Sequence, residues 1–245
     1  MRRITAAVCH EFGAPLELET VTLRAPGAGE IEVTLDAVAI CHSDITYADG
    51  GWGGSLPAVY GHEAAGRVCG MGAGVAGLAD GDPVVVTLIR ACGQCLSCAV
   101  GRPTGCETPT DGDHGPLSTA SGGELHQAMA CGAFAERVVV HHSQIARIPE
   151  GIDMAAASLL ACGVITGVGA VVNAAGLRAG QDVVVIGAGG VGLNAIQGAR
   201  IAGARRIVAV DMTGEKLDAA REFGATDGVL ASAEKPWRAA KAVMG

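Results

Sequence analysis

The chain has few aromatic residues and no concentrated positive charge. Aromatic side chains make up 3% of its 245 residues, whereas 49% are hydrophobic, so Ala, Val, Leu and Ile must build the core. The net charge is −8, and no basic block occurs, which argues against nucleic acid and anionic membranes as partners. The N-terminal stretch lacks the apolar segment of a signal peptide. Without one, nine cysteines indicate a reducing compartment, and we expect the cytoplasm.

One uncharged segment is long enough to raise the question of a transmembrane helix. Residues 154–177 carry no charged side chain, and this length is sufficient to span a bilayer. The segment also contains four glycines, an asparagine and two hydroxyl residues, and it leads into a strand. We therefore expect buried helix and loop in a soluble core, with a transmembrane helix as the alternative.

The most distinctive stretch is CGQCLSCAVGRPTGC, which begins at Cys92. Its four cysteines are Cys92, Cys95, Cys98 and Cys106. Thiolates this closely spaced on a glycine-rich loop are typical of a tetrahedral zinc site, and two disulfides are the alternative. Four sulfurs would fill the coordination sphere, so this zinc would be structural. Any catalytic chemistry must lie elsewhere.

A second metal site is indicated in the first part of the chain. Alternating residues predict strands at 4–12, 16–23 and 30–40, and at 133–140 and 143–149, in a small β-barrel or sandwich. Cys41, in CHSD, follows a predicted strand, and His62 stands in GHEAAGRV. A catalytic zinc needs three protein ligands, and Cys162 in LLACGVITG is the candidate for the third. Residues 107–131 are polar and predict a long surface loop.

The pattern changes at Pro149, where alternation stops and longer apolar runs begin. We therefore expect two domains, residues 1–150 and 151–245. Asp153 is placed to cap a helix that starts at Met154.

The second domain carries a dinucleotide-binding pattern. A strand over residues 183–186 leads into G-x-G-x-x-G at Gly187, Gly189 and Gly192, followed by a helix. Such a loop presents backbone N–H groups to a pyrophosphate. A second strand ends at Asp211, where an acid accepts hydrogen bonds from ribose hydroxyls and favours NAD over NADP. Capping the next helix is the alternative role for Asp211, and that helix should end at Gly224.

Together these motifs resemble the zinc-dependent medium-chain alcohol dehydrogenases along essentially the whole chain. The resemblance implies an α/β fold: a GroES-like, β-rich catalytic domain with a zinc lobe near residues 90–107, followed by the first half of a doubly wound Rossmann domain. It implies two zinc ions per chain, with NAD as cofactor and a primary alcohol or aldehyde as substrate. It also implies a homo-oligomer for a full-length protein.

The resemblance assigns roles residue by residue. It implies catalytic-zinc ligation by Cys41, His62 and Cys162, with Glu63 nearby, proton transfer by Ser43, and orientation of His62 by Asp44. The implied cofactor-binding residues are His42, Thr166, Gly187, Gly189, Gly190, Val191, Gly192, Asp211 and Lys216. Trp52 and Leu88 fall where the family lines its substrate pocket, with ordinary packing as their alternative role.

Three departures from the family pattern bear on function. Thr46 stands where animal members carry a relay histidine, so the proton route beyond Ser43 is open. Thr110 stands where the glutathione-dependent formaldehyde branch carries an arginine, which weakens a glutathione adduct as substrate. The sequence also contains only the first half of the Rossmann pattern. Two alternatives therefore stay open: a truncated, zinc-binding chain without activity, and a member that acts on polyols or other secondary alcohols.

Overall fold

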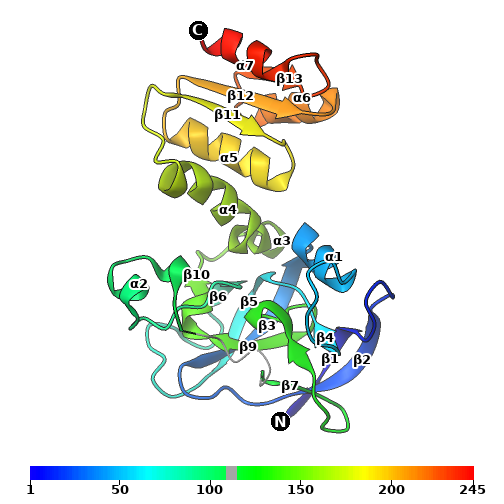
Figure 1. Ribbon diagram of the computed structural model, residues 1–245. Helices are drawn as coiled ribbons and strands as arrows, with labels where there is room; N and C mark the ends of the chain where they lie inside the picture. The colour runs from blue at the N-terminus through cyan, green and yellow to red at the C-terminus, as the bar shows by residue number, and fades with distance from the viewer. Residues whose placement is uncertain (109–114) are drawn as a thin grey trace. The chain divides into compact units, whose positions relative to one another are not determined.

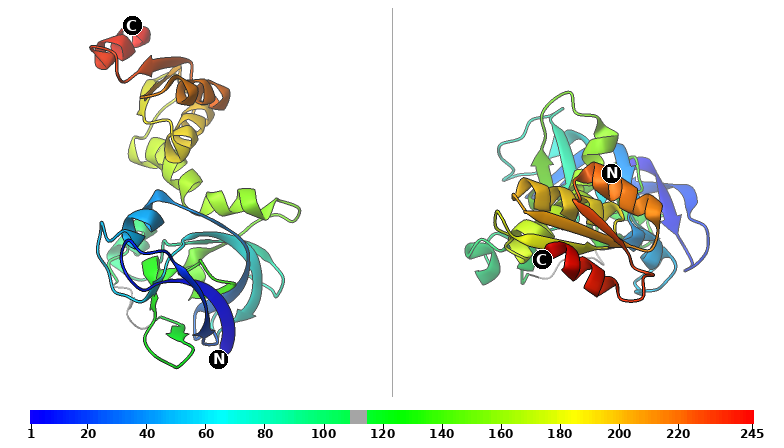
Figure 2. Two further views of the ribbon diagram at one scale, coloured as in Figure 1. Left: turned by 90° about the vertical axis from the view of Figure 1, so that its right-hand side faces the viewer. Right: turned by 90° about the horizontal axis from the view of Figure 1, so that it is seen from above.

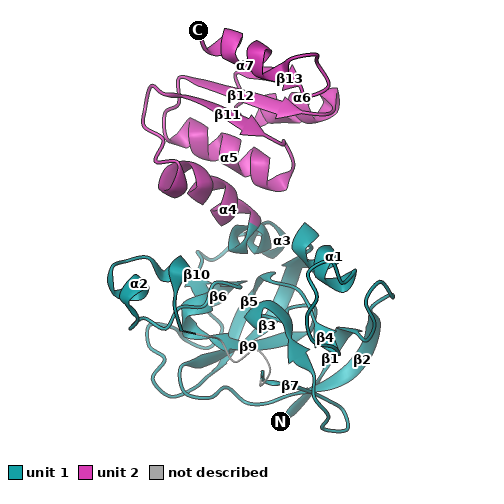
Figure 3. Ribbon diagram, viewed as in Figure 1, with its two compact units in different colours: residues 1–162 teal, residues 163–245 magenta. Residues whose placement is uncertain are grey.

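The computed structural model describes residues 1–108 and 115–245, so Thr110 lies outside the described residues. Two compact units can be distinguished, residues 1–162 and 163–245 (Figure 3). The sequence pattern changes at Pro149, but the division falls after Cys162. The reason is that the helix and the turn that follow Pro149 pack on the first unit, where Ala157 and Ala161 are buried against Val85.

The first unit contains two five-stranded sheets (Figure 1). One has the order β7-β2-β1-β4-β8 and comprises Leu117–Thr119, Glu17–Leu23, Arg2–Cys9, Ala58–Val59 and His126–Gln127. The other has the order β10-β6-β5-β3-β9 and comprises Ile145–Arg147, Pro83–Thr87, Glu63–Met71, Glu30–Ala39 and Arg137–His141. The helical segments of the first unit are α1 (His42–Ala48), α2 (Leu96–Ala99), α3 (Met154–Ser158) and the short 3-10 turns Pro103–Gly105, Ala128–Ala130, His142–Gln144 and Leu159–Ala161. The predicted β-rich domain is confirmed, and each predicted strand overlaps an observed one, although β9 begins at Arg137 and β10 covers only Ile145–Arg147.

The core of the first unit is aliphatic, as the composition predicts. Among the buried hydrophobic residues of the described chain, only Tyr60 is aromatic. The expected long surface loop over residues 107–131 is wrong for residues 115–131, because Leu117 and Leu125 are buried there. Gln127 explains how a polar sequence enters the core: its amide nitrogen donates to the carbonyls of Cys131 and Val139. The buried amide nitrogen of Gln127 is thereby satisfied by the backbone.

The second unit is a three-stranded parallel sheet with helices on both faces (Figure 2). Its strands β11 (Asp182–Ile186), β12 (Arg206–Asp211) and β13 (Asp227–Leu230) lie in that order. Buried residues of α5 (Gly190–Ile201) and α6 (Gly214–Phe223) cover one face, and α7 (Pro236–Met244) covers the other. The parallel order confirms the predicted α/β class. The strand β11 is not buried along its whole length, because Ile186 at its end is 83% exposed.

The uncharged segment forms several short helices. Asp153 caps α3 as predicted, accepting a hydrogen bond from the Ala156 N–H at 2.9 Å. Next come α4 (Gly163–Gly169) and a π-helical turn, Ala170–Ala174. No single helix in the described residues is long and apolar enough to cross a membrane. Only the pair 154–161 and 163–174, taken together, meets the length and composition test.

Candidate functional site

Four potential metal ligands of the first unit converge at one point. One ligand atom each from Cys41, His62, Glu63 and Cys162 lies within 4.8 Å of all the others. His62 and Glu63 are buried, and the two cysteines are half-buried. Two thiols, an imidazole and a carboxylate form a donor set that suits zinc. The three ligands expected for a catalytic zinc are therefore adjacent in the structure.

The register of two strands brings the first three of these residues together. Ala39, the last residue of β3, pairs with Glu63, the first residue of β5. Cys41 follows β3 and caps α1, and His62 immediately precedes β5. Because Cys41 stands between the end of β3 and the start of α1, its thiol lies beside the His62 ring. Cys162 arrives from the 3-10 turn Leu159–Ala161, which follows α3.

Asp44 holds this arrangement through three hydrogen bonds. Its carboxylate lies 3.0 Å from His62 Nδ1 and accepts from the backbone N–H of Gly61 at 3.0 Å and of Cys41 at 2.9 Å. Asp44 is 2% exposed. A carboxylate on Nδ1 fixes the imidazole so that Nε2 faces the other ligands. Burial lowers the pKa of His62, but hydrogen bonds to Asp44 and Cys162 outweigh it and raise the pKa to about 10.

Ser43 and Thr46 differ in their relation to the ligand cluster. Ser43 Oγ lies 3.6 Å from Cys41 Sγ, so its hydroxyl is at the edge of the cluster. Thr46 Oγ1 donates instead to the His42 carbonyl at 3.0 Å, one helical turn back. The Thr46 hydroxyl therefore makes its hydrogen bond within α1.

The four cysteines of the glycine-rich loop also converge. The sulfurs of Cys92, Cys95, Cys98 and Cys106 lie within 4.8 Å of one another. The Cys92–Cys98 and Cys95–Cys106 sulfur pairs are 4.0 Å apart, which is far longer than a disulfide bond. It matches the ~3.8 Å edge of a tetrahedron with Zn–S bonds of about 2.3 Å. All nine cysteines are free, so the disulfide alternative is wrong in this structure.

Backbone N–H groups already point at these sulfurs. Cys92 Sγ accepts from the N–H groups of Gln94 and Cys95 at 3.4 and 3.3 Å. Cys95 Sγ accepts from the N–H of Glu107 at 3.4 Å. The Thr108 hydroxyl, together with the two N–H groups on Cys92, lowers the pKa of the Cys92 thiol to about 6. Such donors stabilise thiolates, which are the metal-binding form of cysteine.

The glycine-rich loop of the second unit joins β11 to α5. Gly187 has φ of +92°, a backbone conformation that glycine adopts most readily. A Cβ on Gly192 would lie 1.7 Å from the Gly187 carbonyl oxygen, whereas a Cβ on Gly189 or Gly190 would meet nothing within 4 Å. The structure therefore has one glycine required for helix–strand packing and open space above the two others. That space is what a pyrophosphate needs at the N-terminus of α5.

Asp211 ties β12 to this loop. Its carboxylate accepts from the Ala188 N–H at 2.7 Å and from the Met212 N–H at 2.7 Å, and Lys216 Nζ lies 3.9 Å away. The hydrogen bond from Ala188 is the main reason why the pKa of Asp211 lies below its ordinary value. Thr213, not Asp211, occupies the N-cap position of α6, and its side chain makes no capping hydrogen bond. That helix ends at Gly224 with φ of +118°, as predicted.

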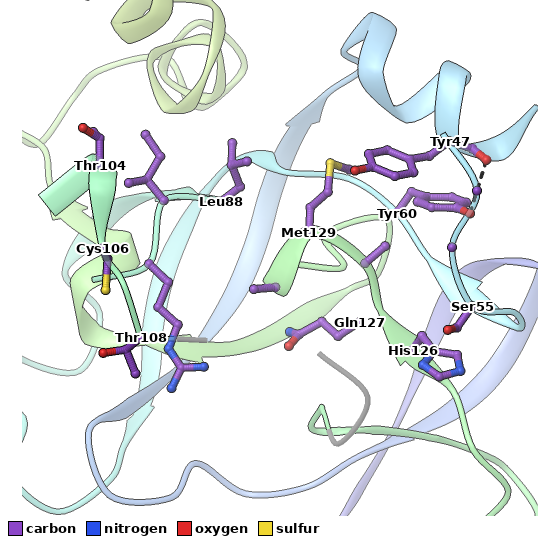
Figure 4. Close-up of a pocket in the computed structure, with 16 residues that line it drawn as sticks. Tyr47, Ser55, Tyr60, Leu88, Thr104, Cys106, Thr108, His126, Gln127 and Met129 are labelled. Atoms are coloured by element: carbon purple, nitrogen blue, oxygen red, sulfur yellow. Dashed lines mark hydrogen bonds between the residues drawn. The ribbon is translucent and has the colours of Figure 1, made fainter. Parts of the chain in front are cut away.

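The remaining sequence candidates are placed less tightly. Val191 lies in the first turn of α5, Thr166 in α4, and His42 is the exposed first residue of α1. Trp52 is 61% exposed and packs edge-on against Tyr47, with ring centroids 5.0 Å apart. Leu88 lines a cavity of about 620 Å³ in the first unit (Figure 4).

Several residues of this cavity were not singled out by the sequence. Tyr47, Tyr60 and Met129 line it together with Arg90 and Gln127. They come from four separate segments, and none belongs to a motif. One feature of the sequence could have indicated this cavity. Aromatic residues are scarce, yet two of the seven line the cavity, and Trp52 packs on Tyr47.

Comparisons with known proteins agree with this geometry. Residues 27–150 match the alcohol dehydrogenase GroES-like domain, and residues 190–244 match the zinc-binding dehydrogenase domain. The chain belongs to the zinc-dependent medium-chain alcohol dehydrogenase family. The resemblance seen in its motifs is thereby confirmed.

Related proteins of this alcohol dehydrogenase family match nearly the whole chain. An NDMA-dependent alcohol dehydrogenase from Amycolatopsis methanolica is 37% identical over 246 residues, covering 98% of this chain and 66% of the relative. An alcohol dehydrogenase zinc-binding domain protein from Burkholderia ambifaria has a TM-score of 0.94 at 37% identity, covering 100% of this chain and 68% of the other. Benzyl alcohol dehydrogenase from Acinetobacter calcoaceticus has a TM-score of 0.91 at 31% identity, with the same coverage. The chain spans 62% to 66% of the length of the curated relatives it matches.

Proposed function

We propose that this chain forms the catalytic and cofactor-binding part of a zinc- and NAD-dependent oxidoreductase that interconverts a primary alcohol and its aldehyde. The observation that supports this most strongly is the convergence of Cys41, His62 and Cys162 within 4.8 Å, with Asp44 fixing the His62 ring. A structural zinc in the four-cysteine lobe would be the second ion of each chain. The free thiols fit a reducing compartment, for which we propose the cytoplasm.

The residues of the chain divide the chemistry among them. When bound by Cys41, His62 and Cys162, zinc would act as a Lewis acid that lowers the pKa of an alcohol. Ser43, whose hydroxyl stands next to the ligand cluster, would then accept the alcohol proton while releasing its own hydroxyl proton toward solvent. Asp44 keeps Nδ1 of His62 occupied, so that the ring offers only Nε2 to the metal. Glu63 lies close enough to reach the metal position.

The second unit would hold NAD. The open space over Gly189 and Gly190 would admit the pyrophosphate, and NAD carries the hydride chemistry. Asp211 and Lys216 would bind the adenosine ribose, and the negative charge of Asp211 would repel the 2′-phosphate of NADP. His42 and Thr166 stay predictions for contacts with the cofactor. A homo-oligomer likewise stays a prediction.

Turnover by matched cysteine variants tests this proposal. NADH formation from benzyl alcohol would be followed by absorbance with the zinc-loaded protein, and repeated with NADP. We expect turnover with NAD and much less with NADP, lost in Cys41→Ser and retained in Cys69→Ser, whose thiol lies outside both clusters. Zinc and NADH binding without any turnover of primary or secondary alcohols would contradict the proposal and favour the inactive alternative.

A further inference from the structure

Gln144 lies in the interior of the first unit, and its side-chain amide is fully engaged. The side chain is 1% exposed and belongs to the last residue of the 3-10 turn that leads into β10. Its amide nitrogen donates to the carbonyls of Thr87 and Ala130, each at 2.9 Å, and its amide oxygen accepts from the His141 N–H at 3.2 Å. A primary amide has two donor hydrogens, so both are used. Gln144 thereby joins the end of β6 to the turn at residues 128–130.

The first of these hydrogen bonds reaches the ligand cluster through β6. Thr87 is the last residue of β6, and its strand partner is Glu63. Glu63 is the first residue of β5 and one of the four residues that converge at the candidate metal centre. Holding the Thr87 carbonyl therefore fixes the strand that flanks Glu63 and the residue before it, His62.

The second hydrogen bond holds a turn in an unfavourable backbone conformation. Met129 and Ala130 have φ of +53° and +52°, a left-handed conformation that residues with a Cβ adopt only at a cost in free energy. Such a conformation persists where the surrounding structure holds it in place. The hydrogen bond from Gln144 to the Ala130 carbonyl is one such contact, and Gln127 holds the next carbonyl, that of Cys131. Two buried amides thus help to keep the turn in this conformation.

This turn leads directly into residues that pack on the metal centre. The Ala133 N–H donates to the Gly61 carbonyl at 2.9 Å. The contact is close, since a Cβ on Gly61 would lie 2.7 Å from the backbone nitrogen of Phe134. The Gly61 N–H in turn donates to Asp44 at 3.0 Å, and Gly61 precedes His62. A displacement of the turn would therefore reach the Asp44–His62 pair through Gly61.

Two routes therefore connect one amide with the ligand cluster. One runs through the pairing of β6 with β5 to Glu63, and the other runs through the turn and Gly61 to His62. Resting on the proposed function, we infer that Gln144 is a positioning residue of the catalytic metal centre. By holding both routes, its amide sets the positions of His62 and Glu63 relative to each other, and with them the affinity of that centre for zinc.

The test compares the loss of this amide with the loss of another buried polar group in the same sheet. Gln144→Met replaces the amide by an apolar side chain of similar length and leaves two buried carbonyls without these donors. The matched control is Glu32→Met, because Glu32 is a buried residue of β3 that accepts from Arg137 at 3.1 Å. Glu32 lies seven residues before Ala39, the strand partner of Glu63, which is roughly 23 Å along the strand.

Two measurements report on the catalytic centre itself. Zinc affinity is measured by chelator competition, with the same variants carrying Cys41→Ser as the baseline for the cysteine lobe. Cobalt is then substituted for zinc, and the difference in its visible spectrum from that baseline reports the ligand geometry. We expect Gln144→Met to alter this spectrum and to weaken zinc binding about 10-fold, the lower end of the range for partners of metal ligands, because Gln144 acts through one further residue. Glu32→Met should keep the wild-type affinity and spectrum, although both variants lose stability.

A second substitution tests the route through the turn. Ala130→Gly removes the Cβ that makes the left-handed conformation unfavourable. Added to Gln144→Met, it should restore part of the lost zinc affinity and move the cobalt spectrum back toward that of the wild type. A gain in stability without a gain in zinc affinity would contradict this route. Should Gln144→Met not fold by itself, the double variant is compared with Ala130→Gly alone, and equal zinc affinities would overturn the proposal.

The positioning role and the proposed function fail separately. Wild-type zinc affinity and cobalt spectrum in Gln144→Met, or equal losses in Glu32→Met, would mean that Gln144 only stabilises the fold, even if the protein oxidises alcohols. Turnover of the wild type with NAD at saturating zinc tests the activity alone. If turnover is absent while zinc affinity depends on Gln144, the positioning role stands and the proposed activity fails.

Discussion

The carboxylate of Asp44 and the imidazole of His62 form a buried pair, with Oδ1 and Nδ1 3.0 Å apart and each side chain 2% exposed. The same oxygen accepts the N–H of Gly61, and the second oxygen accepts the N–H of Cys41. One side chain thus joins α1 to both segments that supply the first two ligands. Asp44 therefore fixes the positions of Cys41 and His62 relative to each other.

Replacing Asp44 by Asn should loosen the metal without removing a ligand. The amide can accept from only one side, so its NH₂ group would face an N–H donor. We expect zinc affinity at the catalytic centre to fall by roughly 10- to 100-fold, with a loss of about 1–3 kcal/mol in the free energy of unfolding. Chelator competition measures the affinity. Asp49→Asn, at the exposed end of α1, is the control and should retain wild-type affinity; an equal loss in both would count against the role of Asp44.

Two cysteine substitutions should separate the metal sites. Cys41→Ser should remove one zinc per chain and abolish turnover while the fold is kept. Cys95→Ser should remove the other zinc and lower the melting temperature, because closed zinc–thiolate sites contribute directly to folding stability. Metal analysis and thermal unfolding of the two variants give the answer. If both variants retain two zinc ions, the assignment of two sites is wrong.

Local chemistry explains which parts could be predicted from the sequence. The dinucleotide-binding pattern comprises Gly187, Gly192 and the strand ending at Asp211. The backbone geometry requires glycine at both positions, and the parallel sheet forms where the pattern predicts it. The four cysteines converge because their spacing is short. The cysteines are neighbours in the sequence, and Asp211 follows the glycine loop at a separation that the pattern itself specifies.

The parts that could not be predicted depend on contacts between distant segments. Leu117 and Leu125 are buried in a polar stretch because they pack against the sheet, and no periodic pattern in the sequence predicts this. Gln127 is polar, but it can enter the interior because its amide nitrogen donates to two backbone carbonyls there. Arg90 belongs to no motif, and only the structure shows that it lines a cavity. The register of β3 against β5 brings Cys41, His62 and Glu63 together, and neither this register nor the approach of Cys162 follows from the spacing of the motifs.

Asp211 should make the second unit sensitive to acid. Its pKa is lowered, chiefly by the hydrogen bond from Ala188, so the folded state favours the carboxylate. This stabilisation is present above the ordinary value of 3.8 and is lost as the pH falls through the lower folded-state value. In Asp211→Asn, stability should be lower at neutral pH and should lose this acid-dependent decrease.

Unfolding of the second unit can be followed on its own. Trp52 and Trp237 are the two tryptophans of the chain, so urea unfolding of a Trp52→Phe background reports on α7 through Trp237 fluorescence. Asp218→Asn is the control, because that side chain is 74% exposed and its pair with Arg221 spans one helical turn. Such pairs contribute about 0.3–0.5 kcal/mol. An unchanged acid response in Asp211→Asn would show that the hydrogen bond from Ala188 does not stabilise the unit.

Two glycines of one loop should respond to the same substitution in opposite ways. In Gly192→Ala the new Cβ would lie 1.7 Å from the backbone oxygen of Gly187, so α5 must move away from β11 and the second unit should lose stability. In Gly189→Ala the new Cβ meets nothing within 4 Å, and φ is −83°. That variant should fold normally, but its methyl group would occupy the space through which a pyrophosphate approaches the backbone. Thermal unfolding and calorimetric titration with NADH separate the two effects: Gly189→Ala should keep its melting temperature and bind NADH at least 10-fold more weakly. Wild-type NADH affinity in Gly189→Ala would mean that the dinucleotide does not lie over this loop, whatever the loop's resemblance to a phosphate-binding turn.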